Sequence, residues 1–304
     1  MSMNDNNTIL NTSHLTKFYG KQCGIEDINL EVRKGEVFGY LGPNGAGKTT
    51  TIRVLLDFIR PTSGIATIFG FNSRLSSVET RRRIGYLPGE LSMYGNLTGV
   101  ELLHYVASLR GGTDLTYATD LAKRMDCDLT RRLKALSHGN RQKIGLIQAF
   151  MHRPQLIILD EPTIGLDPLM QQEFYRLISE ARTDECTVFL SSHILPEVER
   201  VCDRVGIIRE GRLVAVETVE TLKSRALRRL EIHFARVVPP EDFMSIAGVR
   251  DVVVRDSVLS CIVVGSLDTL IKTAARFEVV NIVSHEPSLE EVFLTYYGGS
   301  KSNA

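Results

Sequence analysis

The sequence predicts an α/β core with a helical insertion, followed by a small α+β domain. Short apolar runs that read as buried strands alternate with segments of helical spacing, as is typical of α/β proteins; the runs cover residues 37–41, 156–159 and 187–190. From about residue 226 the short strands and helices follow a different order. A chain of 304 residues accommodates two domains at roughly 150 residues each. We therefore assign residues 1–225 to the first domain and residues 226–304 to the second.

The first domain contains further elements of both kinds. Alternating residues predict a strand at 28–32, and a turn at Lys34 separates it from the apolar run at 37–41. Long helices are expected over 48–60 and 169–181, and a hairpin over 205–216. The helical insertion covers about residues 90–150, with helices at 100–109, 116–125 and 140–150.

The second domain shows the order βαββαβ, which is the ferredoxin-like split unit. Its expected elements lie at residues 229–235, 240–246, 249–254, 258–264, 267–276 and 278–284. A last helix is expected from Ser288, because Glu291 follows it at the spacing of a capping box.

Composition excludes several classes of protein. The chain is 43% hydrophobic and 24% charged, which indicates a globular protein rather than a disordered one. Lys+Arg and Asp+Glu both number 36, and this balance argues against a nucleic-acid binder. The five cysteines form no Cys-x-x-Cys pair, so we expect reduced thiols. The N-terminus does not resemble a signal peptide, and no apolar run approaches ~20 residues. We therefore expect membrane contact only through a partner.

A glycine-rich loop connects the strand at 37–41 to the next helix. Gly42 and Gly47, followed by Lys48 and Thr49, match the phosphate-binding P-loop, in which backbone amides and a helix N-terminus bind phosphate oxygens. Lys48 is expected to reach the β- and γ-phosphates, and the Thr49 hydroxyl to bind Mg²⁺. The alternative is a glycine-rich turn without a ligand. The predicted nucleotide-binding segment is Gly42, Pro43, Asn44, Gly45, Ala46, Gly47, Lys48, Thr49 and Thr50.

Two acidic residues follow the apolar strand at 156–159. Asp160 is placed at the carboxyl edge of the sheet, beside the phosphates, where it would hold the Mg²⁺ shell. Glu161 is positioned to orient and deprotonate the water that attacks the γ-phosphate. An Asp-Glu pair after a strand is also compatible with a plain turn, but the P-loop upstream favours the catalytic interpretation.

Further segments resemble the motifs of ABC-type ATPases. Residues 136–143 (LSHGNRQK) are similar to the LSGGQ signature, residues 164–167 to the D-loop, residues 191–193 to the switch-histidine loop and residues 17–20 to the adenine-stacking loop. With the P-loop and the two acids, these motifs span about residues 15–220. The resemblance implies a P-loop NTPase core with an antiparallel β subdomain, and ATP and Mg²⁺ as cofactors.

The resemblance also implies a head-to-tail dimer that holds two ATP molecules. Ser137 and Gly139 of one chain would contact the γ-phosphate bound by Lys48 of the other, His193 would contact it from its own side, and Asp167 would cross the interface. Tyr19 would stack on adenine, although an aromatic ring packed in a strand is the alternative. The partner motor is a second copy or a related chain.

The sequence departs from the family pattern at two points. Gly89 stands where the family usually has a glutamine that helps to bind Mg²⁺, and we hypothesise that Glu90 supplies a carboxylate instead, the alternative being a solvated acid. His138 replaces the first glycine of the signature, where it either makes dimer closure pH-sensitive or is a bystander.

Three functions remain open for such an ATPase: the motor subunit of a transporter, a soluble ATPase in another process, and a low-turnover nucleotide-gated regulator. Residues 287–299 resemble the tail of ATP-binding subunits of bacterial multidrug and antibiotic exporters, as do the short stretches at 86–90 and 96–99. We therefore expect an export motor at the cytoplasmic face of the cell membrane, bound there through separate transmembrane permease subunits. The helical insertion and the loop at residues 89–95 would supply the contact surface.

Overall fold

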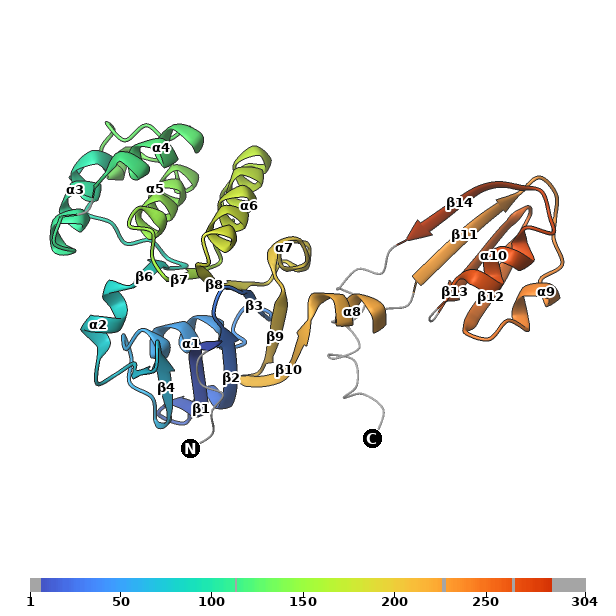
Figure 1. The fold of residues 1–304 in the computed structure, drawn as a ribbon, viewed down its shortest axis with the longest axis horizontal. Coiled ribbons are helices and arrows are strands. Elements are labelled where there is room, and N and C mark those ends of the chain that lie inside the picture. Colours follow the sequence, from blue (N-terminus) through green and yellow to red (C-terminus); the bar gives the residue numbers. More distant parts are fainter. Residues whose placement is uncertain (1–6, 113, 226–227, 264–265, 286–304) are drawn as a thin grey trace. The chain divides into compact units, whose positions relative to one another are not determined.

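The computed structural model describes residues 7–112, 114–225, 228–263 and 266–285. The chain divides into two compact units, residues 1–217 and 218–304, and each is described by itself (Figure 1).

The first unit is built on a six-stranded sheet of order β10-β9-β3-β8-β7-β6. Its strands are β3 (Val37–Leu41), β6 (Ile84–Leu87), β7 (Leu156–Asp160), β8 (Thr187–Ser192), β9 (Arg204–Arg209) and β10 (Arg212–Thr218). Strands β9, β3, β8, β7 and β6 pair in parallel. Every residue of β3, β7 and β8 is buried, which explains why these strands read as continuous apolar runs. Their carboxyl ends therefore meet at one edge of the sheet.

A second sheet of order β2-β1-β4-β5 shares a hydrophobic core with the first. Its antiparallel strands are β1 (Thr8–Tyr19), β2 (Gln22–Arg33), β4 (Ser63–Ile68) and β5 (Phe71–Asn72). Helix α1 (Lys48–Leu55) contributes Ile52, Val54 and Leu55 to this core. Helix α1, which begins at the end of the glycine-rich loop, is thereby fixed by packing on both sheets.

Helices form the remainder of the first unit (Figure 1). They are α2 (Ser77–Arg82), α3 (Gly99–Leu109), α4 (Thr116–Arg124), α5 (His138–Phe150), α6 (Pro168–Thr183) and α7 (Leu195–Val201), with a 3₁₀ helix at Leu133–Ala135. Leu102, Leu133, Leu136 and Ile144 form a separate small core among the helices between β6 and β7. Thr98 and Glu101 form a capping box that starts α3.

The second unit contains a four-stranded antiparallel sheet of order β12-β13-β11-β14. Its elements are α8 (Val219–Arg225), β11 (Arg228–Phe234), α9 (Glu241–Met244), β12 (Val249–Arg255), β13 (Val258–Val263), α10 (Asp268–Ala274) and β14 (Val279–His285). From β11 onward this is the predicted βαββαβ order, with the first and third strands at the centre. Phe234, Phe243 and Leu270 lie in its own hydrophobic core.

Some boundaries differ from the sequence-based expectation. Helix α1 ends at Leu55 rather than at residue 60, because Asp57 takes the left-handed conformation (φ 54°) and interrupts the helical hydrogen bonds. Strands β1, β4, β5 and β6 and helices α2, α7 and α8 were not expected. The helix expected from Ser288 lies outside the described residues.

Candidate nucleotide-binding site

The glycine-rich loop between β3 and α1 is held in place by close backbone contacts. A side chain at Gly42 would collide with the Ile208 carbonyl, and Gly47 has a φ of 108° that L side chains rarely adopt. The Gly42 amide donates to the Ser192 carbonyl (3.2 Å), and the Ala46 carbonyl accepts from the Gly211 amide (2.9 Å). The loop is thereby tied to β8 and to the β9–β10 turn, and its shape is fixed before a ligand binds.

Lys48 lies inside this loop. It is 5% exposed, and its Nζ donates to the carbonyls of Gly42 (2.7 Å) and Pro43 (3.2 Å). The same Nζ lies 3.1 Å from Glu161 Oε1. The ammonium group is therefore directed at the centre of the loop, where it can pair with an anion.

Asp160 accepts hydrogen bonds on both carboxylate oxygens. Thr49 Oγ1 donates to Oδ2 (2.8 Å) and Ser191 Oγ donates to Oδ1 (2.5 Å), and Asp160 is completely buried. Burial, and then the charge of Asp160, raise the pKa of Tyr86 to about 12, so the phenol stays neutral beside the carboxylate. The structure thus brings the two predicted Mg²⁺ ligands together.

This pair of oxygen donors fits a magnesium ion. Mg²⁺ prefers oxygen ligands and usually keeps waters and phosphate oxygens in its shell, so one hydroxyl and one carboxylate from the protein suffice. Within the described residues no group of three His, Cys, Asp or Glu side chains could hold a metal. Waters and the phosphate oxygens of a bound nucleotide would complete the Mg²⁺ shell.

Glu161 lies between Lys48 and His193. Its Oε2 is 2.7 Å from His193 Nδ1, and its side chain is 13% exposed. The residue takes a left-handed φ of 52°, which costs free energy for a non-glycine residue and persists only where neighbours enforce it. The Glu161 amide donates to the Ser191 carbonyl (3.2 Å), and Gln142 Nε2 donates to the carbonyls of Glu161 (3.4 Å) and Pro162 (3.0 Å).

Gln142 and Ser191 are site residues that we did not predict. Gln142 is 1% exposed and connects helix α5, which begins at the signature, to the backbone of Glu161. Gln142 lies in the polar first half of α5, next to Arg141 and Lys143, so the sequence carried no signal that this amide is buried and needs hydrogen-bond partners.

A cavity of about 420 Å³ opens beside the P-loop. Its lining comprises Tyr19, Gln22, Cys23, Gly24, Asn44, Gly45, Gly47, Lys48, Thr49, Thr50 and Glu161. Tyr19 ends strand β1 and is 45% exposed, so its ring is accessible rather than packed in the sheet. The ring lies against Gly24, where an added Cβ would be 2.9 Å from it. An exposed aromatic ring at the rim can stack on a base.

Ser137, Gly139 and Asp167 do not line this cavity. Ser137 caps α5 by accepting from the Asn140 amide (3.3 Å), and Asp167 caps α6 by accepting from the Met170 amide (3.0 Å). Gly139 packs closely on the Gly165 carbonyl, and the His138 ring lies against Gly165. The signature and the D-loop are therefore neighbours, but they do not reach the phosphate loop of their own chain.

Glu90 is exposed, and within the described residues no hydrogen bond or ion pair connects it to Thr49 or Asp160. The backbone of Gly89 lies against Asp160 instead, since an added Cβ would be 3.1 Å from Oδ2. The Glu90 ligand role stays a prediction.

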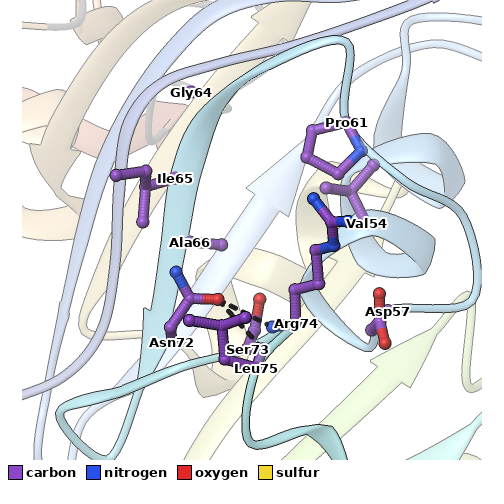
Figure 2. Close-up of a pocket in the computed structure, with 10 residues that line it drawn as sticks. All are labelled: Val54, Asp57, Pro61, Gly64, Ile65, Ala66, Asn72, Ser73, Arg74 and Leu75. Atoms are coloured by element: carbon purple, nitrogen blue, oxygen red, sulfur yellow. Dashed lines mark hydrogen bonds between the residues drawn. The ribbon is translucent and has the colours of Figure 1, made fainter.

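A separate pocket lies between the end of α1 and strands β4 and β5 (Figure 2). The Asn72 side chain there accepts from the amides of Arg74 (3.0 Å) and Leu75 (3.2 Å), which shapes the loop that borders it. None of the predicted site residues lines this pocket.

Comparison with known proteins identifies the family. The family model described as "ABC transporter" matches residues 25–164. The chain is 37% identical to the bacitracin transport ATP-binding protein BcrA of Bacillus licheniformis, covering 96% of this chain and 98% of that protein. It is 32% identical to the linearmycin resistance ATP-binding protein LnrL of Bacillus subtilis (strain 168), covering 95% and 98%. The chain therefore belongs to the ATP-binding subunits of ABC transporters.

Solved structures agree with this assignment. The structure of an ATP-binding subunit of an ABC transporter matches with a TM-score of 0.66 at 31% identity, over 71% of this chain and 92% of that one. The dimeric cassette MJ0796 matches with a TM-score of 0.65 at 21% identity, over 69% and 99%, and supports the fold alone. The predicted fold class and the ATPase activity are confirmed: the protein is an ATP-binding ABC-type ATPase. In the part of the chain that the structure describes, no helix is long and apolar enough to cross a membrane.

Proposed function

We propose that this chain is the motor of an exporter: it closes around two Mg–ATP with a second copy or a related chain and drives a separate membrane permease. The observation that supports dimerisation most is the separation of the two half-sites. Lys48 lines the cavity, whereas Ser137 and Gly139 lie exposed or half-exposed elsewhere, so a second cassette is needed to bring a signature to the triphosphate. Ile164 (41%) in the D-loop and Leu169 (75%) just after it are exposed apolar side chains suited to such an interface.

The residues of the site divide the chemistry among them. The backbone amides of residues 44–50 and the Lys48 ammonium would bind the phosphates, and Tyr19 would stack on adenine. Thr49 and Asp160 would hold Mg²⁺, which when bound supplies charge neutralisation at the β- and γ-oxygens. Glu161 would orient and deprotonate the attacking water, and His193, already 2.7 Å from Glu161, would contact the γ-phosphate. Ser137, Gly139 and Asp167 would act across the dimer.

Glu90→Ala is expected to raise the Mg²⁺ concentration needed for half-maximal ATP hydrolysis about tenfold, because we assign Glu90 a carboxylate contribution to the metal shell. The measurement is a Mg²⁺ titration of turnover at fixed ATP. Glu185→Ala, which removes an acid far from the site, is the control and leaves the titration unchanged. Equal nucleotide affinity and hydrolysis in Glu90→Ala and wild type would show that Glu90 is a solvated acid.

The names of the relatives support export of antibiotic-like compounds, since they refer to bacitracin transport and linearmycin resistance. The chain would then lie at the cytoplasmic face of the membrane, held by its permease. Co-purification from detergent-solubilised membranes tests this: an attached hydrophobic subunit supports the motor role. A chain recovered without one would favour a soluble ATPase, and a chain that scarcely turns over would favour a nucleotide-gated regulator.

Tyr94→Ala is expected to reduce recovery of that hydrophobic subunit severalfold while ATP hydrolysis by the isolated chain is unchanged. Tyr94 is 63% exposed in the loop before α3, and its ring meets Tyr105 edge-on at 5.8 Å between centroids. Exposed aromatic pairs are frequent anchors of protein interfaces. Val237→Ala in the second unit, which is also exposed (73%), is the control. Full recovery with Tyr94→Ala would place the contact surface elsewhere.

A further inference from the structure

Glu197 is a buried acid next to the loop that carries His193. It lies in the first turn of α7, is 1% exposed, and packs under the end of strand β8. Its Oε1 atom is buried and has no hydrogen-bond partner in the part of the chain that the structure describes. A buried carboxyl group is costly, so its presence at this position calls for a function.

Ser192 connects Glu197 to the histidine loop. Ser192 Oγ donates to Glu197 Oε2 (2.5 Å) and accepts from the Ile194 amide (2.9 Å). The Ser192 hydroxyl gives its one proton to Glu197, and one of its two lone pairs accepts from the Ile194 amide. The hydrogen bond from the Ile194 amide closes the turn 192–194, and the hydrogen bond to Glu197 fixes the Ser192 hydroxyl that accepts it. His193 lies at the centre of this turn, with Nδ1 2.7 Å from Glu161 Oε2.

Burial raises the pKa of Glu197 to about 7, and the hydroxyls of Ser192 and Thr163 oppose this rise. The other titratable groups that face it are few. Glu161 raises its pKa further and His193 lowers it. Burial raises the pKa of Tyr175 on α6 and of the Cys202 thiol after α7, and the nearby Glu197 charge raises both pKa values further. Glu197 therefore changes charge near neutral pH.

We propose that Glu197 is a positioning residue, which acts through Ser192 to hold the turn that places His193 beside Glu161. This inference rests on the proposed function, because it takes His193 and Glu161 to act on the γ-phosphate. The ionised carboxylate is the stronger acceptor and has no proton of its own to offer, so the turn is held most firmly above neutral pH.

Glu197→Gln and Ser192→Ala test this link. Glutamine has nearly the same size but cannot ionise, and alanine removes the hydroxyl. We expect kcat at pH 8 to fall roughly tenfold in both variants, because a misplaced His193 would slow hydrolysis. KM for Mg–ATP should change less than about twofold. The double variant is expected to lose no more than either single one. The difference in kcat between wild type and Glu197→Gln should become smaller toward pH 6, where Glu197 itself is protonated.

Thermal unfolding separates positioning from a structural role. The raised pKa means that ionised Glu197 destabilises the fold, and this cost appears as pH rises from the unfolded-state value through about 7. Glu197→Gln removes the cost, so its Tm at pH 8 should equal or exceed that of wild type even though kcat falls. Glu199→Gln on the same helix is the control and should match wild-type kcat.

Three results would overturn the inference. If both variants have the kcat of an active wild type at every pH, the role of Glu197 is overturned and the proposed function is not affected. A loss of kcat that follows a fall in Tm would assign Glu197 a structural role. A wild-type chain without magnesium-dependent hydrolysis would overturn the proposed function as well.

Discussion

Lys48→Ala is expected to lower the affinity for Mg–ATP at least a hundredfold. Among the residues that line the cavity, Lys48 is the cation, and its Nζ already lies at hydrogen-bond distance from two loop carbonyls. A hydrogen bond to a charged group contributes about 1.5–3 kcal/mol, and Lys48 would make such bonds to two phosphates. Tenfold in affinity corresponds to about 1.4 kcal/mol, so two lost bonds account for the expected change. Isothermal titration calorimetry measures it.

The variant also leaves Glu161 without its cationic neighbour at 3.1 Å, so folding must be checked by circular dichroism before calorimetry. Lys34→Ala is the matched control, because Lys34 is an exposed lysine paired with Glu185 at the far edge of the domain. The affinity of Lys34→Ala for Mg–ATP should equal that of wild type. Unchanged binding in Lys48→Ala would show that the glycine-rich loop is not the phosphate site.

The site was predictable to the extent that it depends on short sequence patterns. Lys48 and Thr49 follow a loop whose spacing is fixed by backbone geometry, and Asp160 ends a strand whose apolar residues mark it as central. The role of Gln142 was not predicted, because it depends on hydrogen bonds to Glu161 and Pro162, which lie in another element. The contact between Ser192 and Glu197 was not predicted, because a short helix does not reveal which of its residues are buried.

The elements of the fold also differ in how well the sequence predicted them. Fully buried strands such as β3 and β7 could be read directly, whereas β1 contains several register shifts against β2 that disrupt its alternation. Helix α7 is a short element with Pro196 near its start, and too short to show a period. In the second unit the alternation of β11 was clear, since Leu230, Ile232 and Phe234 face its core.

Glu161→Gln is expected to trap a dimer with ATP bound. Glutamine keeps the size of the side chain but cannot take a proton from water, so hydrolysis should slow by roughly a factor of 10² to 10⁴. The substitution also removes the negative charge of Glu161, which lies 3.1 Å from Lys48. In the wild type this charge would compete with the γ-phosphate for the Lys48 ammonium. Binding is therefore preserved or strengthened while the step that reopens the dimer is blocked.

Light scattering measures the result directly. With saturating Mg–ATP the mass of Glu161→Gln should rise from 33.9 kDa to twice that value, whereas wild type reverts to the monomer as ATP is consumed. Combining Glu161→Gln with Lys48→Ala should abolish the dimer, because a cassette that does not bind ATP presents nothing to the partner's signature. Replacing Ser137 by alanine in the Glu161→Gln background should weaken the dimer without weakening ATP binding to the monomer, since Ser137 does not line the cavity of its own chain and is proposed to contact the partner's γ-phosphate. A Glu161→Gln chain that stays monomeric at saturating Mg–ATP would contradict the two-cassette mechanism, because the two half-sites would then have no means of meeting.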